Sequence, residues 1–284
     1  LCREYKKERA TVHLKELVGG ALSFYAAAAA VKTGGVHVFV AEDRDAAAYL
    51  MNDFYNLLDE KQVYFFPSSY KRSVAYGAED AQGVVQRTAA MNAVKGFTKG
   101  YLIVCTYPEA LAERVADAET LRRDTIAVKV GDSISIAVLE DALVDANFTR
   151  VDFVYEPGQY SVRGGIVDVF SFSESKPYRI DFFGDEVDSI RRFNISSQLS
   201  ADKLDRVEII PNLNAGDGAA KVSFVQFAGD AAAYWFYDAD YVLRRVNDIR
   251  RRTLADMERP EEIDRLMTSR NALLGDLANC RMLA

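Results

Sequence analysis

Residues 156–193 carry the pattern that most restricts how this chain can fold. Three strand-like runs follow one another there, and turn residues separate them at Gly158, at 164–165 (Gly-Gly) and at 184–185 (Gly-Asp). Glycine-containing turns between short alternating runs are typical of a tight antiparallel meander. The sequence therefore predicts a small β-rich region in this part of the chain.

The run that precedes the 184–185 turn predicts two faces of different chemistry. Its side chains alternate, so Phe182 lies on an apolar face, whereas Arg179 and Phe183 lie on a charged one. If the turn is a two-residue hairpin loop, Phe182 lies opposite Val187. An aromatic ring beside arginine on an exposed face is the usual composition of a binding hot spot.

Arg163, Arg179 and Phe183 are therefore candidate binding residues, and each also has an ordinary structural interpretation. Arg163 precedes the glycine pair, where a bulge can turn a side chain outward, but it could instead pair with Asp168. Arg179 could pair with Asp188 across the hairpin. Phe183 could be covered by an adjoining domain.

Two phrases in this region, EPGQYSVRGGIVDVF and PYRIDFFGDEVDSIRRF, carry a family resemblance. They resemble the signature of the small β-rich domain shared by the nucleotide-excision-repair protein UvrB and the transcription-repair coupling factor (Mfd), and they are closer to the coupling-factor form. Residues 65–68 (Phe-Phe-Pro-Ser), with Tyr76 beyond them, resemble that family's FPDWETLPY region, although no tryptophan is present there. We therefore expect an N-terminal, UvrB-like fragment of a transcription-repair coupling factor.

The resemblance also implies a partner and a site. In this family the β-rich domain binds the damage-recognition ATPase UvrA through the arginine of R-G-[GA], the arginine of P-Y-R and the second phenylalanine of F-F. Those positions match Arg163, Arg179 and Phe183, and all three keep the family's residue. An arginine fork can hold a carboxylate through two parallel hydrogen bonds, so exchange for lysine would not be neutral. The family's full-length protein masks this surface with its C-terminal domain, which would cover Phe183 there.

Composition is that of a globular protein from a reducing compartment. The 284 residues include 49% hydrophobic and 27% charged residues, and the three cysteines form neither a disulfide framework nor a zinc-binding spacing. No apolar run approaches the length of a membrane span, and the first residues do not resemble a signal peptide. We therefore expect a cytoplasmic protein with no membrane partner. A net charge of −7 argues against tight nonspecific DNA binding by this chain.

The periodicity predicts an α/β fold: a parallel, helicase-like α/β unit with an inserted β-rich domain. Residues 1–124 would form the first part of the unit, and residues 125–210 would form the β-rich UvrB-like interaction domain. Residues 211–284 would either form the second part of the α/β unit or fold apart from it. Expected helices cover 20–33, 45–58, 80–94, 137–146 and 240–257, with a short one from Pro108; expected α/β strands cover 36–41, 63–66, 101–106 and 233–238.

The α/β unit resembles a helicase domain that has lost its nucleotide site. A P-loop needs Gly-x-x-x-x-Gly-Lys-[Ser/Thr], so that backbone N–H groups and the lysine hold the phosphates. Residues 18–24 (Val-Gly-Gly-Ala-Leu-Ser-Phe) keep glycines but lack that lysine and hydroxyl, whereas UvrB keeps an intact P-loop. The acid pair at 42–43 could imitate a Walker B motif, but a helix cap is the more ordinary interpretation.

No other constellation predicts catalysis or metal binding. His37 is interpreted as a packed or sheet-edge histidine rather than a ligand, and Cys105 as a small core residue. Arg244, Arg245 and 250–252 lie on a predicted helix, where pairing with acids or solvent is expected, and contact with a DNA backbone is the alternative.

We therefore expect a non-catalytic module that recruits UvrA to RNA polymerase stalled at a lesion. We expect this chain to bind no cofactor; ATP and Mg²⁺ would be used by the ATP-dependent translocase domains of the full-length family protein, which also contacts RNA polymerase and DNA. The alternative is a DNA-handling domain of a UvrB-like helicase, which the net negative charge disfavours.

Overall fold

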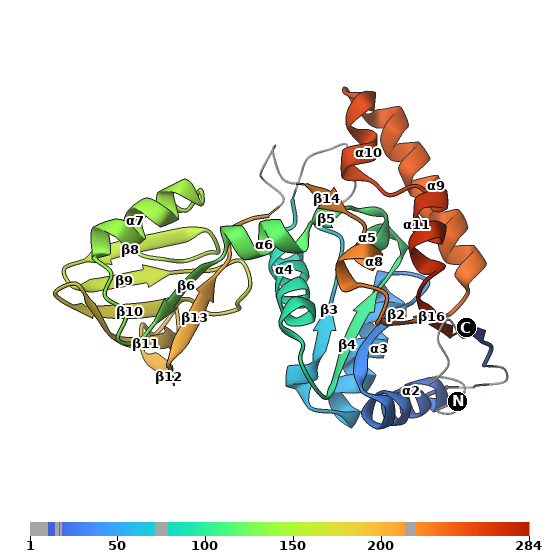
Figure 1. The fold of residues 1–284 in the computed structure, drawn as a ribbon, viewed down its shortest axis with the longest axis horizontal. Helices are drawn as coiled ribbons and strands as arrows, with labels where there is room; N and C mark the ends of the chain where they lie inside the picture. The colour runs from blue at the N-terminus through green and yellow to red at the C-terminus, as the bar shows by residue number, and fades with distance from the viewer. Residues whose placement is uncertain (1–10, 15–16, 18, 72–78, 214–219, 284) are drawn as a thin grey trace. The chain divides into compact units, whose positions relative to one another are not determined.

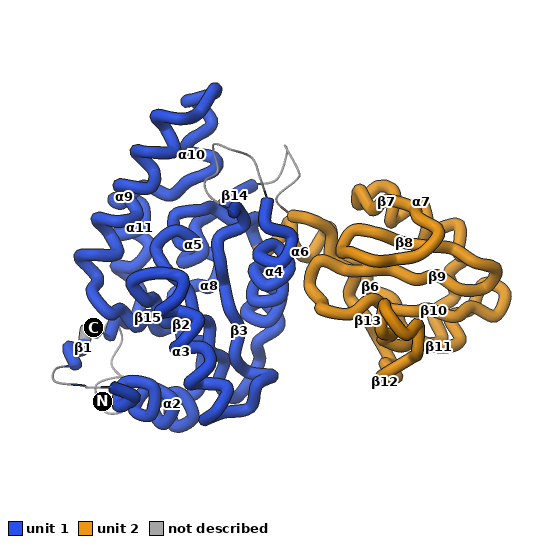
Figure 2. The backbone as a smooth tube through the Cα atoms, turned by 180° about the vertical axis from the view of Figure 1, so that it is seen from behind, with its two compact units in different colours: residues 1–117, 220–284 blue, residues 118–219 orange. Residues whose placement is uncertain are grey.

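The computed structural model describes residues 11–14, 17, 19–71, 79–213 and 220–283. Cys2, Val18, Tyr76 and the loop residues 214–218, which entered the predictions above, lie outside the described residues. The chain divides into two compact units, residues 1–117 with 220–284 and residues 118–219 (Figure 2). The second unit is therefore an insertion in the first.

Two short strands of the first unit flank the insertion, one directly before it in the sequence and one directly after it. β5 (Val115–Ala116) pairs antiparallel with β14 (Lys221–Val222). The expected boundaries after residues 124 and 210 lie inside the insertion, because helix α6 (Ala118–Asp124) lines a hollow of the second unit together with Ile126 and Pro211.

The first unit is built on a six-stranded sheet whose neighbouring strands are all parallel, so the predicted parallel α/β fold is confirmed (Figure 1). A buried parallel sheet needs near-continuous apolar strands, and the central ones have them. In spatial order the strands are β1 (Thr11–Val12), β16 (Arg281–Leu283), β15 (Ala233–Phe236), β2 (Gly35–Val40), β4 (Tyr101–Thr106) and β3 (Val63–Phe65).

Helices cover both faces of this sheet. The rings of Phe39 and Phe54 meet on the face that carries α2 and α3, and those of Phe66 and Phe224 stack on the face that carries α4 and α8. Among the described residues, no helix is both long and apolar enough to span a bilayer. The helices are α2 (Ala21–Thr33), α3 (Arg44–Leu57), α4 (Ala81–Gly96), α5 (Pro108–Ala112), α8 (Phe224–Ala228), α9 (Ala239–Asp256), α10 (Ile263–Leu266) and α11 (Arg270–Leu277), with 3₁₀ turns η1 (Glu60–Gln62) and η3 (Pro260–Glu262).

Three residues weighed for chemistry have structural roles in this unit. Asp43 caps α3, since its carboxylate accepts a hydrogen bond from the N–H of Ala46. Cys105 is fully buried in β4, and burial raises the pKa of its thiol, which keeps it protonated and unreactive. His37 is buried on the central strand β2 and is therefore packed rather than at a sheet edge.

The hydrogen bonds of His37 fix its neutral form. Trp235 donates from Nε1 to Nδ1 at 3.0 Å, so Nδ1 carries no proton and Nε2 is the atom that donates to the carbonyl of Gly34 at 3.0 Å. If Nδ1 were protonated, its N–H would face the N–H of Trp235, and two donors cannot form a hydrogen bond with each other. Burial lowers the pKa of His37 from 6.5 to about 4.

We expect His37 to make the first unit less stable as the pH falls. Between pH 6.5 and about 4 the unfolded chain binds a proton at this residue that the folded chain does not, so the free energy of unfolding decreases by about 3 kcal/mol across that window. Urea titrations from pH 7 to 4.5, followed by the fluorescence of Trp235, measure this loss. His37→Gln should remove part of the slope, and an unchanged slope would contradict the assignment.

The second unit places a six-stranded sheet against a helix and a two-stranded sheet. Leu139 and Leu143 of the helix pack on Val167 and Ile180 of the sheet. The order in the large sheet is β12 (Ser200–Leu204), β11 (Glu186–Phe193), β10 (Tyr178–Phe183), β9 (Ile166–Val169), β8 (Gln159–Arg163) and β7 (Thr149–Arg150); β13 (Arg206–Ile209) pairs with β6 (Ile126–Lys129), and the helix is α7 (Ile136–Asp145).

The predicted meander is confirmed, with one correction to its register. Phe182 lies opposite Val187, as expected from a two-residue turn, and Gly184 supplies the positive φ of 62°. A bulge follows, because Asp181 lies opposite Ser189 and leaves Asp188 without a cross-strand partner. The pairing of Arg179 with Asp188 is therefore wrong.

Candidate functional site

One row of polar side chains crosses five strands of the second unit. The registers align Ser161, Asp168, Arg179, Arg191 and Lys203 from β8 to β12. Because side chains in strands alternate between faces, this row lies on the face opposite the buried residues Val167 and Ile180. We call it the polar row.

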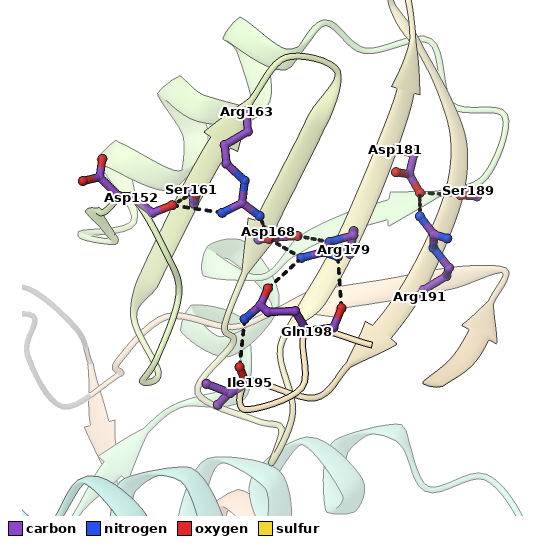
Figure 3. Close-up of polar contacts among 10 residues, drawn as sticks. All are labelled: Asp152, Ser161, Arg163, Asp168, Arg179, Asp181, Ser189, Arg191, Ile195 and Gln198. Atoms are coloured by element: carbon purple, nitrogen blue, oxygen red, sulfur yellow. Dashed lines mark hydrogen bonds and ion pairs between the residues drawn. The ribbon is translucent and has the colours of Figure 1, made fainter. Parts of the chain in front are cut away.

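Asp168 is the shared acceptor of two arginines. Arg179 reaches it with both arms of its fork, Nε to Oδ1 at 2.7 Å and Nη2 to Oδ2 at 2.8 Å, and Arg163 reaches Oδ2 with Nη2 at 2.5 Å (Figure 3). The carboxylate is almost completely buried, with 2% of its side chain exposed. The expected pair of Arg163 and Asp168 is thus present, and Asp168 also takes the place expected for Asp188 beside Arg179.

Each arginine is also held by an aromatic ring and a loop. The guanidinium of Arg179 lies 4.4 Å from the ring centre of Phe193 and donates to the side-chain oxygen of Gln198 at 3.1 Å. Arg163 lies 4.9 Å from the ring centre of Phe153. Hydrogen bonding to Asp168 raises the pKa of Arg179, so it stays charged.

The two arginines differ in accessibility. The side chain of Arg163 is 36% exposed, whereas that of Arg179 is 15% exposed. Arg163 donates to the backbone oxygen of Asp152 at 3.0 Å as well as to Asp168. Arg163 is therefore the arginine that an incoming molecule meets more readily.

A second ion pair lies on the same face of the large sheet. Arg191 contacts Asp181, and the hydroxyl of Ser189 donates to the same carboxylate at 2.6 Å. Asp181 and Arg191 are 20% and 30% exposed. This pair neutralises itself and leaves the surplus positive charge with Arg163 and Arg179.

Phe183 lies at the end of the same face, opposite Glu186 beside the turn, and 83% of it is exposed. An exposed ring contributes little to the core, and covering it would release the water around it, so Phe183 stays a candidate binding residue. The arginines and this ring thus share one face.

Sequence reasoning missed part of this surface. It considered Asp168 only as a partner of Arg163, and it did not single out Arg191, Lys203, Phe153 or Gln198. The period-2 pattern in β11 and β12 would have placed Arg191 and Lys203 on the polar face, but the contact of Gln198 with Arg179 joins residues far apart in the chain and has no local signal.

The basic residues of α9 are largely paired within the first unit. Arg245 contacts Glu109 at 2.8 Å, Arg250 contacts Asp264 at 2.6 Å and Arg251 contacts Asp248 at 3.1 Å. The expectation of acid-paired arginines is confirmed for these three.

The carboxyl ends of β2 and β15 border a mainly apolar cavity of about 310 Å³. This end of an open parallel sheet is where ligands usually bind. Leu14, Phe39, Trp235 and Phe236 are among its lining residues, together with Glu42. Apolar walls and a carboxylate do not suit the phosphates of a nucleotide, and within the described part of the chain no cluster of His, Cys, Asp and Glu could hold a metal ion.

The model of one protein family, described as the UvrB interaction domain, matches residues 126–214. This region is similar to the UvrB interaction domain. The match covers nearly all of the second unit, including the polar row and Phe183.

Curated relatives of the chain extend this match beyond the UvrB interaction domain. The chain is 29% identical over 199 residues to the transcription-repair-coupling factor of Bacillus subtilis and 28% identical over 199 residues to that of Escherichia coli, covering 70% of this chain and 17% of each relative. It is 30% identical over 128 residues to that of Haemophilus influenzae, covering 45% of this chain and 11% of the relative. The resemblance to transcription-repair coupling factors is thus confirmed, and the chain spans about a sixth of the length of the first two.

Proposed function

We propose that this chain recruits the damage-recognition ATPase UvrA during transcription-coupled nucleotide excision repair. The observation that carries the proposal is the single face of the UvrB interaction domain on which Arg163, Arg179 and the exposed ring of Phe183 lie together. The module itself is non-catalytic. In a full-length protein it would work beside an ATP-dependent DNA translocase that engages stalled RNA polymerase.

The chemistry of this face suits a partner surface with an apolar pocket and carboxylates around it. Arginine forks bind carboxylates in two parallel hydrogen bonds, and a large aromatic ring supplies apolar area with few rotatable bonds. Two arginines share one carboxylate here, so this trio carries a net positive charge toward the partner.

DNA handling, the alternative function, has less support. Three arginines of α9 are already bound to acids, and the chain carries a net charge of −7, which opposes approach to a polyanion.

Calorimetry with purified UvrA from the same source tests the proposal. The intact chain should bind, and Arg163→Ala should weaken binding by about tenfold, because it removes the more exposed arginine of the surface. Arg206→Ala is the matched control, since Arg206 is exposed on β13 and pairs locally with Glu208; it should leave affinity unchanged. Absence of binding by the folded chain, together with a salt-dependent shift of duplex DNA, would favour the DNA-handling function instead.

A further inference from the structure

We infer that Asp168 is a positioning residue of this surface: it holds Arg163 and Arg179 in the orientation in which carboxylates of an acidic partner meet them. The inference rests on the proposed binding of UvrA and adds to it a residue that is too buried to contact that partner. Only 2% of the Asp168 side chain is exposed.

Both oxygens of Asp168 are committed to the arginines. Oδ1 accepts from Nε of Arg179, and Oδ2 accepts from Nη2 of Arg179 and Nη2 of Arg163. A carboxylate removed from water costs free energy unless it is paired and hydrogen-bonded, so this geometry is strongly favoured in the folded domain. One buried acid therefore sets the direction of two cations that start from different strands.

The surroundings of the trio support the same arrangement. Gln198 adopts a positive φ of 58°, which is uncommon for a residue other than glycine, and in that conformation its side-chain oxygen accepts from Arg179 at 3.1 Å. The rings of Phe193 and Phe153 lie against the two guanidinium groups. Each arginine is thus fixed on several sides before any partner arrives.

Fixing these side chains in advance should slow dissociation. A free arginine loses rotamer entropy when it is immobilised. Where that loss occurs on folding, it no longer opposes binding, which is the usual advantage of preorganisation. Arg163 remains 36% exposed toward a partner, while Asp168 holds its Nη2 and the Asp152 carbonyl holds its Nη1.

A positioning role of Asp168 and a purely electrostatic role predict opposite effects of Asp168→Asn on the dissociation rate constant. If Asp168 acted only through its charge, neutralising it would make the face more positive, and an acidic partner would associate faster and bind more tightly. If Asp168 positions the arginines, the amide leaves them mobile and presents a donor to their N–H groups, so dissociation accelerates. The two rate constants therefore separate the interpretations.

Surface plasmon resonance of the intact chain over immobilised UvrA provides the measurement. For Asp168→Asn we expect a dissociation rate constant raised about tenfold or more, with an association rate constant equal to or above that of the wild type. Asp181→Asn is the matched control, because it makes the same change of charge on the same face but contacts Arg191 and Ser189. Its dissociation rate constant should stay within about twofold of the wild type.

A second variant keeps the test independent of folding defects. Arg179→Lys retains the charge but cannot make the two-armed contact with Asp168, so it should also accelerate dissociation. Each variant is compared at a temperature below its melting transition. An unchanged dissociation rate constant in Asp168→Asn, or an equal rise in Asp181→Asn, would overturn the positioning role, whereas absence of wild-type binding would overturn the proposed function.

Discussion

Replacing Phe183 with alanine is expected to weaken the binding of UvrA by roughly 30-fold, which corresponds to about 2 kcal/mol. The ring is 83% exposed at the end of the arginine face, so a partner that covers it gains most of its apolar area. The arginines around it supply directional contacts, and aromatic residues with neighbouring arginines commonly carry most of the free energy of an interface. Calorimetric titration of UvrA with wild type and variant measures the change.

The same substitution should leave the stability of the domain almost unchanged, because an exposed ring contributes little to the core. The matched control is Val144→Ala, which removes apolar area that is 55% exposed on α7, on the opposite side of the sheet. We expect this control to bind UvrA as the wild type does. A Phe183→Ala variant that binds normally, or a Val144→Ala variant that loses as much affinity, would place the interface elsewhere.

Local patterns predicted the central strands and the longer helices of the first unit, and the helix of the second unit, to within a few residues. The strand of residues 101–106 and the helix from Pro108 lie where expected, because apolar periodicity and a proline at the first helical turn are local signals. Strand alternation likewise placed Arg179 and Phe183 on the polar face. The general position of the candidate surface was therefore readable from the sequence.

The pairings within that surface were not readable in the same way. A single-residue bulge after Asp181 shifts the register of β11, so that Arg191 rather than Ile190 lies opposite Arg179 and Asp188 has no cross-strand partner. The shared role of Asp168 depends on side-chain contacts across three neighbouring strands, which the predicted meander alone does not specify. Tertiary register therefore decided which acid Arg179 meets, whereas the pair of Arg163 and Asp168 was among the sequence-based interpretations.

A buried ion pair in the first unit was also absent from the sequence-based predictions. Arg87 of α4 and Glu113, which follows α5, are 2% and 6% exposed and lie 3.7 Å apart. Glu113 accepts hydrogen bonds from the hydroxyls of Ser68 and Ser69, and from the Ser69 N–H at 3.0 Å.

Arg87 depends on that carboxylate as its counter-charge. Its guanidinium donates to the carbonyl of Pro67 at 2.8 Å and lies 4.0 Å from the ring centre of Phe66, and burial lowers its pKa. A buried cation whose acid is removed remains in a medium of low polarity with no charge to compensate it. The segment around Pro67 would lose its anchor at the same time.

Glu113→Ala is therefore expected to lower the free energy of unfolding of the first unit by about 3–5 kcal/mol. Urea titration followed by the fluorescence of Trp235, the single tryptophan of the chain, reports this unit specifically. Glu262→Ala is the control, because its partner Arg259 is 73% exposed and an exposed pair contributes less than about 1 kcal/mol. If both variants lost the same small amount of unfolding free energy, solvent would be compensating the charge of Arg87. The ion pair of Arg87 and Glu113 could then not be what holds residues 67–69 against α4 and α5.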